Sequence, residues 1–396
     1  MRKLKIIVLS VTISLLGFMA FRLGGQQRLM DRTTKEFYLQ RIAEWFKEMQ
    51  DVFIGKWFSS EIDEEQLRKI HELNKKLLTP LGPQVLPYLI IVTQVNHIIG
   101  SPIHSITKFL PHNIVLSRKP RNLLSTTEEF PEVVEKNVSY DARKVWLLWW
   151  VEGERRTLQW FTDRYGKWLV ARKQGDAQKT KAMYQKLLDI GIAAIPLWLE
   201  KLQSEQDKSI RQEIMKALSY LTDGEVNLNM SPQECLKWWE ANRERWEIPF
   251  PKSKKEFLEW LEKEGWEEQM LSIPSVITIS RLEDEEAIDV LIRFLRHPNP
   301  LVRGISLGRI MILFGEQLPK EYALGVGTDD WETVGDLIEM GKYDWIRKKV
   351  MKLMKWMEDD KMTNKIAKEL LDWWQENRGK IKIYWKRAWN VNYELP

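Results

Sequence analysis

The chain contains, at residues 210–221, the stretch Ile210-Arg211-x-x-Ile214-Met215-Lys216-x-Leu218-x-x-Leu221, and it repeats this stretch as Ile346-Arg347-x-x-Val350-Met351-Lys352-x-Met354-x-x-Met357. In both copies the apolar residues are spaced three or four positions apart. Residues at this spacing lie on one face of an α-helix. The stretch therefore predicts two helices that each bury one apolar stripe.

A second string follows each copy after a short connection. It reads Leu236-Lys237-Trp238-Trp239-Glu240-Ala241-Asn242-Arg243 and then Leu371-Asp372-Trp373-Trp374-Gln375-Glu376-Asn377-Arg378. The copies are 136 residues apart for the first string and 135 for the second. Two matched strings in the same order indicate the duplication of a helix pair, and a helix pair buries its apolar faces only by stacking against neighbours.

Further matches extend the repeat toward the N-terminus. Gly82 precedes Pro87 by five residues, as Gly191 precedes Pro196, and Val302-Arg303 echoes Ile210-Arg211. The matches predict about four helical hairpins, near residues 66–110, 180–246, 282–316 and 340–380.

The order of these features resembles HEAT repeats: a first helix ending near a proline, a turn with Asp or Asn, and a second helix that opens with an apolar residue and Arg. Residues 194–211 and 288–303 follow this order. The Trp-Trp-x-x-Asn-Arg ending is similar to that of exported bacterial HEAT-like proteins. The resemblance covers roughly half of the chain, and it implies an all-α fold, an irregular α-solenoid of stacked hairpins. The structural repeat positions that it implies are Pro87, Pro196, Arg211, Arg303 and Arg347.

The arginine that opens each second helix needs a separate explanation, because a cation is unfavourable at a helix N-terminus. We expect it to pair with a carboxylate or a carbonyl of the adjacent unit. This is a packing role rather than a ligand-binding role.

Three segments depart from the helical pattern. Residues 380–384 alternate in the manner of a strand, and residues 272–279 are rich in β-branched side chains, although Pro274 argues against a strand there. Residues 111–140 contain three prolines and few apolar clusters. We expect a long loop or a partly extended excursion at 111–140.

The first 25 residues have the layout of a targeting segment. Arg2, Lys3 and Lys5 precede an apolar run of 16 residues at 6–21. Signal-peptide cores have about 7–15 residues and membrane-spanning helices about 17–25, so length alone leaves both open. Positive charges stay in the cytoplasm, so the rest of the chain is expected outside it.

Signal-peptide cleavage requires small residues one and three positions before the cut. A cut after Ala20 places Phe18 at the third position, and a cut after Gly25 places Leu23 there. We therefore favour an uncleaved membrane anchor over a cleaved, secreted form. A buried N-terminal helix is a third reading, which the absence of a polar face disfavours.

Composition excludes several classes of protein. The net charge is +5, but residues 1–25 hold four basic side chains and no acid, so residues 26–396 carry 57 basic and 56 acidic side chains. A nearly neutral body argues against nucleic-acid binding, which depends on many phosphate contacts. A single cysteine, Cys235, excludes an intramolecular disulfide and a cysteine-based zinc site.

Tryptophan is unusually frequent, with 20 residues in 396. Neighbouring side chains on a helix point about 100° apart, so both members of an adjacent Trp pair cannot face one core. We expect one of each pair at a seam between hairpins or at the surface. The rings either pack between helices or form an aromatic platform for a peptide, a glycan or a membrane interface.

The end of the chain is basic and aromatic. Five cations between residues 378 and 387 meet no acid until Glu394, and Tyr384, Trp385, Trp389 and Tyr393 lie among them. This tail either covers the last hairpin, because a terminal repeat needs a polar outer face, or contacts anionic lipid or polymer.

Signals for catalysis are weak. His97, His104 and His112 fall close together and could serve a metal, but Gly100, Pro102 and Pro111 interrupt the segment, and three or four convergent ligands are needed. The acidic runs fit helix starts, and no phosphate loop, nucleophile elbow or dinucleotide loop occurs. We expect no cofactor and no enzyme activity.

We therefore expect a membrane-anchored scaffold that binds a protein partner outside the cytoplasm. The alternatives are a module that binds lipid or wall polymer through Trp-rich helices and the basic tail, and, remotely, a metal-dependent enzyme at the three histidines. The expected segments are 1–25 (anchor), 26–170 (helical, with one hairpin and the irregular stretch), 171–250, 251–320 and 321–396 (hairpin units, the last with the tail). The expected partner-binding residues, at the ends of the duplicated unit, are Trp238, Trp239, Arg243, Trp373, Trp374 and Arg378.

Overall fold

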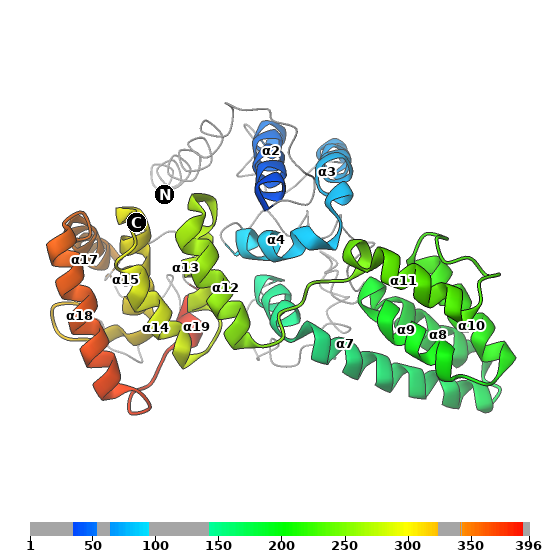
Figure 1. Ribbon diagram of the computed structural model, residues 1–396. Coiled ribbons are helices and arrows are strands. Elements are labelled where there is room, and N and C mark those ends of the chain that lie inside the picture. The colour runs from blue at the N-terminus through cyan, green and yellow to red at the C-terminus, as the bar shows by residue number, and fades with distance from the viewer. Residues whose placement is uncertain (1–34, 54–63, 95–141, 324–340, 342, 391–396) are drawn as a thin grey trace. The chain divides into compact units, whose positions relative to one another are not determined.

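A computed structural model describes residues 35–53, 64–94, 142–323, 341 and 343–390 (Figure 1). Most of these residues are helical and none of them forms a strand, which confirms the prediction of an all-α fold. The expected anchor at 1–25, the irregular stretch at 111–140 and the three clustered histidines lie outside the described residues.

The described residues divide into two compact units. The first unit contains residues 35–90 and 142–252 of the described chain, and the second contains residues 91–94 and those from 253 onward.

The first unit is built from packed helical pairs. Helices α2 and α3 pack together, as do α7 and α8 and then α9 and α10, and α11 packs on α9 (Figure 1). The elements are α2 (Lys35–Phe53), α3 (Glu64–Leu77), η1 (Thr79–Leu81), η2 (Pro83–Val85), α4 (Leu86–Thr93, whose last residues belong to the second unit), α7 (Ala142–Lys173), α8 (Ala177–Leu188), η6 (Gly191–Ala194), α9 (Ile195–Ser204), α10 (Lys208–Leu221) and α11 (Pro232–Trp246).

Short polar side chains fix where these helices begin. Asp176 and Asp207 accept backbone N–H groups at the starts of α8 and α10. Ser231 and Glu234 form a reciprocal capping box at the start of α11. Each cap satisfies donors that have no partner inside the helix.

The two Gly-to-Pro matches share one local structure. Gly82 and Gly191 adopt positive φ angles of 67° and 75°, which glycine tolerates without strain. Each glycine leads through a 3₁₀ turn into a helix whose second residue is the proline, Pro87 in α4 and Pro196 in α9. The expectation that a helix ends near Pro196 is wrong, since proline, which lacks an N–H donor, fits the first turn of a helix.

Aromatic side chains fill the core of the first unit. Trp149 and Trp150 are both buried, although they are adjacent on α7, so neither lies at the surface. Phe250 packs against both rings, at centroid distances of 5.1 and 5.6 Å. A second segment therefore covers the side of α7 that would otherwise expose one ring.

The second unit is also helical. Helices α12 and α13 pack together, α15 packs against α13, α14, α17 and α19, and α14 packs against α18 (Figure 1). The elements are α12 (Lys254–Glu267), α13 (Gln269–Ser280), α14 (Glu285–Phe294), α15 (Pro300–Phe314), η7 (Gly315–Gln317), α17 (Tyr343–Trp356), α18 (Asp360–Asn377) and α19 (Trp385–Asn390).

Both strand-like segments lack strand structure. Residues 272–279 lie within α13, where burial on every side accommodates β-branched residues despite Pro274. Residues 380–384 form an irregular connection whose polar groups bond to the second unit: Gln317 Nε2 donates to the carbonyl oxygen of Lys382 at 2.6 Å, and the Tyr384 N–H donates to that of Leu313 at 2.9 Å. These bonds replace the strand partner that the segment does not have.

The described part of the tail is docked on the second unit. Arg281 and Arg309 each donate to the carbonyl oxygen of Ala388 at 3.0 Å. Arg387 and Trp389 are buried, and the Arg387 guanidinium lies 3.9 Å from the Tyr384 ring centroid. This segment therefore packs on the second unit and buries the cation Arg387, whereas Lys380 and Lys382 are exposed.

Candidate functional site

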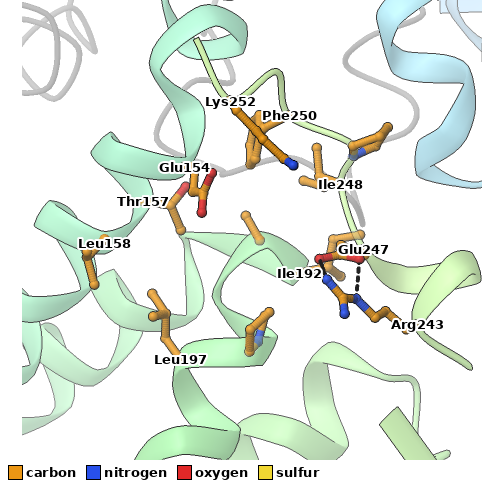
Figure 2. A pocket seen from close by; sticks show the side chains of 13 residues that line it. Glu154, Thr157, Leu158, Ile192, Leu197, Arg243, Glu247, Ile248, Phe250 and Lys252 are labelled. Atoms are coloured by element: carbon orange, nitrogen blue, oxygen red, sulfur yellow. Dashed lines mark hydrogen bonds and ion pairs between the residues drawn. The ribbon is translucent and has the colours of Figure 1, made fainter. Parts of the chain in front are cut away.

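A pocket of about 460 Å³ opens in the first unit, between α7, the start of α9 and the end of α11 (Figure 2). Most of its lining is apolar, and the charged groups carry both signs. The lining residues are Glu154, Thr157, Leu158, Ile192, Ala193, Pro196, Leu197, Arg243, Glu247, Ile248, Pro249, Phe250 and Lys252.

Three sequence segments that are distant along the chain form the pocket. Helix α7 supplies Glu154 and, three and four residues later on the same face, Thr157 and Leu158. The turn η6 and the first turn of α9 supply the wall that contains Pro196 and Leu197. The repeat-specific proline therefore shapes the pocket by setting where α9 begins.

The back of the pocket is fixed by Phe250. A Cβ atom placed on Gly153 would lie 2.1 Å from Phe250 Cε1, so α7 admits the ring only because residue 153 has no side chain. The contacts of Phe250 with Trp149 and Trp150 anchor the segment that follows α11. The contact with Trp149 is edge-to-face, an arrangement that aromatic rings prefer.

Glu247 is held from two sides. Arg243 donates to its two carboxylate oxygens at 2.5 and 2.8 Å (Figure 2), and this carboxylate raises the pKa of the arginine. Gln84 Nε2 donates to the backbone oxygens of Glu244 and Glu247 at 2.8 and 3.3 Å. The 3₁₀ turn after Gly82 thus positions the charged wall of the pocket.

Thr157 is the polar group that the pocket leaves unsatisfied. Its side chain is 3% exposed, and its hydroxyl has no hydrogen-bond partner among the described residues. A buried hydroxyl without a partner costs about 1–3 kcal/mol. A ligand group that bonds to Thr157 would recover this free energy.

The ionisable groups of the pocket lining are few. The lining contains neither histidine nor cysteine, and its charged side chains are two glutamates, one arginine and one lysine. Among the described residues, no three His, Cys, Asp or Glu side chains lie close enough together to hold a metal ion.

Of the predicted binding residues, Arg243 reaches this pocket. Trp238 and Trp239 lie on α11 outside its lining and are half-buried. Their ring centroids are 6.4 Å apart, and that of Trp238 lies 6.1 Å from Trp246. They pack mainly within α11 and its end.

The second copy of the string is a packing element. Trp374 is 0% exposed and packs 5.5 Å from Phe314, with Trp373 5.1 Å from the same ring. Arg378 binds Glu285 and Asp289 of α14 at 3.3 and 3.0 Å. The ring of Trp374 is enclosed between α18, α14 and α15, so it offers no exposed surface for the expected partner contact.

Both copies nevertheless keep the same backbone contact. Asn242 Nδ2 donates to the carbonyl oxygen of Trp238 at 2.8 Å, and Asn377 Nδ2 donates to that of Trp373 at 2.8 Å. The repeated asparagine therefore satisfies a carbonyl in the last turns of its helix.

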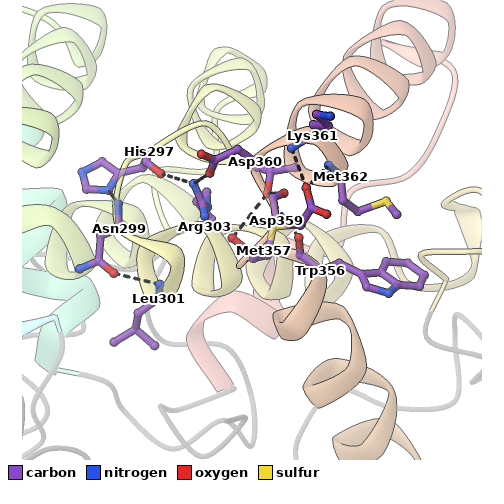
Figure 3. Close-up of polar contacts among 11 residues, drawn as sticks. His297, Asn299, Leu301, Arg303, Trp356, Met357, Asp359, Asp360, Lys361 and Met362 are labelled. Carbon is purple, nitrogen blue, oxygen red and sulfur yellow. Dashed lines mark hydrogen bonds and ion pairs between the residues drawn. The ribbon is translucent and has the colours of Figure 1, made fainter.

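The repeat arginines also share one contact. Arg211 Nε donates to the carbonyl oxygen of Glu205 at 2.5 Å, and an N–H of Arg303 donates to that of His297 at 3.3 Å, six residues earlier in each case. Arg303 also binds Asp360 of α18 at 2.8 Å (Figure 3). The carbonyl belongs to the preceding turn of the same hairpin, whereas the carboxylate belongs to the next helical pair. The side chain of Arg347 lies outside the described part.

Sequence reasoning did not identify Glu154, Thr157, Leu158, Phe250 or Lys252. The residues that could have pointed to this site are Gly153, in the middle of a Trp-rich helix, and the segment Ile-Pro-Phe-Pro-Lys at 248–252, directly after the Trp-Trp string.

No helix among the described residues is both long and apolar enough to span a bilayer. Comparison of the chain with protein-family models, with curated proteins and with solved structures finds no significant match.

Proposed function

We propose that this protein is a non-catalytic, HEAT-like α-solenoid that binds a protein partner through the pocket of its first unit. The successive helical pairs, the repeated Gly-to-Pro turn and the shared arginine contact support the repeat assignment. Helical repeats present extended surfaces, which suit protein partners better than small substrates.

The observation that carries the proposal is an apolar pocket that encloses one unsatisfied hydroxyl. Leu158 and Leu197 supply apolar surface at the pocket, and Thr157 supplies the hydrogen-bonding group. This combination fits an extended protein segment that inserts an apolar side chain and places a backbone group against Thr157.

The charges at the pocket narrow the choice of occupant. Glu154 and Glu247 balance Arg243 and Lys252, and Arg243 is already paired with Glu247. A strongly charged metabolite would meet as much repulsion as attraction. A neutral segment with a polar backbone matches the pocket better.

The proposal includes an N-terminal membrane anchor and a body outside the cytoplasm. Its support is the charge and apolar pattern of residues 1–25. Protease treatment of intact and permeabilised spheroplasts would test it, with digestion of the body in the intact spheroplasts as the expected result.

The pocket can be tested with a peptide library displayed on phage and selected on the purified full chain. Leu158 and Val170 lie on the same helix and are 53% and 51% exposed, but only Leu158 lines the pocket. Leu158→Glu should weaken the selected peptides at least about tenfold, and Val170→Glu should leave them unchanged. Peptides that bind Leu158→Glu as tightly as the unmodified chain would contradict the proposal.

A further inference from the structure

Positive charge is concentrated near the end of the chain. Residues 343–390 contain 13 basic and seven acidic side chains, whereas residues 26–342 contain 44 basic and 48 acidic ones. The small net charge of residues 26–396 is therefore mainly the sum of a basic region at 343–390 and a slightly acidic region at 26–342.

Helix α17 carries an exposed part of this charge. It packs against α15 and buries Leu353, and Met357, directly after the helix, is also buried. On its other side Lys348, Lys352 and Lys355 are exposed, and their spacing of four and three residues aligns them along the helix. We call this the α17 face.

Large apolar side chains border the three lysines. Trp345 and Met351 are each 45% exposed, and at 100° per residue they fall on opposite sides of the lysine row. Trp356 lies on the same side as Trp345, with the Lys352 ammonium 5.5 Å from its ring centroid. The α17 face therefore combines cations with apolar surface.

The lysines of the α17 face have no acidic partner. Among the described residues, no carboxylate lies within ion-pair distance of Lys348, Lys352 or Lys355. Elsewhere in this unit, Arg293 pairs with Glu262 and Arg378 pairs with Asp289. The unit neutralises cations between its helices but leaves this row available for an external anion.

We propose that the α17 face binds the surface of a bilayer that contains anionic phospholipid. A basic amphipathic helix binds such a surface through lysines at the phosphates and apolar side chains at the acyl boundary, where tryptophan is favoured. A single convex helix offers no groove for a peptide, whereas a flat bilayer surface requires none.

This inference concerns the second unit and does not depend on the pocket of the first. It also moves the lipid contact from the basic tail to α17, because the described tail is docked through Ala388 and buries Arg387 and Trp389. The two proposals can therefore fail separately.

A fluorescent label on α17 would test the inference in the full chain. Cys235 is fully buried and burial raises the pKa of its thiol, so an environment-sensitive dye would react selectively with the new thiol of Met351→Cys. On vesicles containing phosphatidylglycerol, the dye should shift its emission to the blue and be quenched by spin-labelled lipid. On vesicles of phosphatidylcholine alone, or at high salt, the emission should remain that of a dye in water.

The label also separates this contact from the expected N-terminal anchor, which would hold the chain on both kinds of vesicle without moving residue 351 into the interface. The triple change Lys348→Glu, Lys352→Glu and Lys355→Glu in the labelled chain should lower the bound-to-free ratio of the dye on the order of a hundredfold, at about 1 kcal/mol per lysine. The matched control changes Lys173, Lys179 and Lys181, which are exposed in the first unit, to Glu, and it should leave the signal unchanged.

Three results would overturn the assignment. The first is a dye that stays in water on anionic vesicles, and the second is an equal response on neutral vesicles. The third is a response to soluble polyglutamate with none to vesicles, which would identify an acidic protein segment instead of lipid. Circular dichroism of each variant would confirm that the helices are intact.

Discussion

Trp374 donates its indole N–H to Oδ1 of Asp289 at 3.0 Å and so joins α18 to α14. Arg378 binds the other carboxylate oxygen at 3.0 Å, and its guanidinium lies 5.6 Å from the Trp374 ring centroid. Asp289 therefore binds both Trp374 and Arg378, two of the side chains that the second string shares with the first. No described acid joins the first string to another helix in this way, and its arginine binds Glu247 four residues later.

This difference predicts unequal costs for the two copies. Trp374→Ala should lower the free energy of unfolding by about 3–5 kcal/mol, since the ring is fully enclosed. Trp239→Ala should cost clearly less, because Trp239 is half-buried. Urea unfolding of both variants, followed by circular dichroism, measures the difference. Equal losses of unfolding free energy would show that the burial of each ring does not determine the cost of removing it.

Arg303 should be more important for stability than its acidic partner. Its side chain is 6% exposed and bonds to His297 O and Asp360, whereas the Asp360 side chain is 81% exposed. Arg303→Met should cost about 1.5–3 kcal/mol, as expected for bonds from a charged donor. Asp360→Asn should cost less than about 1 kcal/mol, because an exposed carboxylate contributes little. Thermal unfolding in low and high salt would test both values.

Two glycines on α7 should respond in opposite directions to alanine. At Gly153 a Cβ would collide with Phe250, so Gly153→Ala should destabilise by about 1–3 kcal/mol and disturb the pocket. At Gly166 a Cβ would meet no atom within 4 Å, so Gly166→Ala should stabilise by about 0.5–1 kcal/mol. Denaturant unfolding gives both signs, and destabilisation by Gly166→Ala would refute the stated packing.

His297 should make stability depend on pH below neutrality. Burial lowers the pKa of His297 from its ordinary value near 6.5, and the nearby Arg303 acts in the same direction. Nδ1 of His297 accepts a hydrogen bond from the Asn299 N–H at 3.1 Å. When the pH falls below the pKa that His297 has in the unfolded chain, the unfolded chain binds a proton. The buried ring of the folded chain binds this proton only at lower pH. The contribution of His297 to stability is therefore complete above about pH 6.5 and is lost progressively below it.

The variant His297→Asn removes this titration while it keeps a side-chain oxygen for the Asn299 N–H. The free energy of unfolding should fall less steeply for the variant than for the unmodified chain between about pH 6.5 and 5. Parallel curves would mean that His297 does not contribute to the dependence.

The repeat strings predicted the helical class because their information is local. The apolar spacing in residues 210–221 specifies a helix with one buried face, and Asp207 and Asn299 cap the helices that follow them. The arginine in each second helix also needed an acceptor for a general reason, since its charge opposes the helix dipole. Arg303 binds the expected carboxylate of the adjacent helical pair, whereas Arg211 binds a carbonyl of its own hairpin instead.

The same local information could not predict which copy of the string is enclosed. Trp239 and Trp374 occupy equivalent positions, but Phe314 and Asp289 enclose the second ring, and these residues lie elsewhere in the chain. The strand-like alternation at 380–384 failed for a related reason, because a strand needs a neighbouring strand and this segment finds Gln317 and the end of α15 instead.

The sequence by itself determined that the described chain is helical and which of its residues repeat. Only the tertiary structure decided that Phe250 packs against Gly153 and that Arg243 lines a pocket together with residues of α7 and α9. It also decided that three exposed lysines of α17 have no acidic partner among the described residues. Helix formation depends on neighbours within a few residues, whereas a pocket and an unpaired face depend on what distant segments cover.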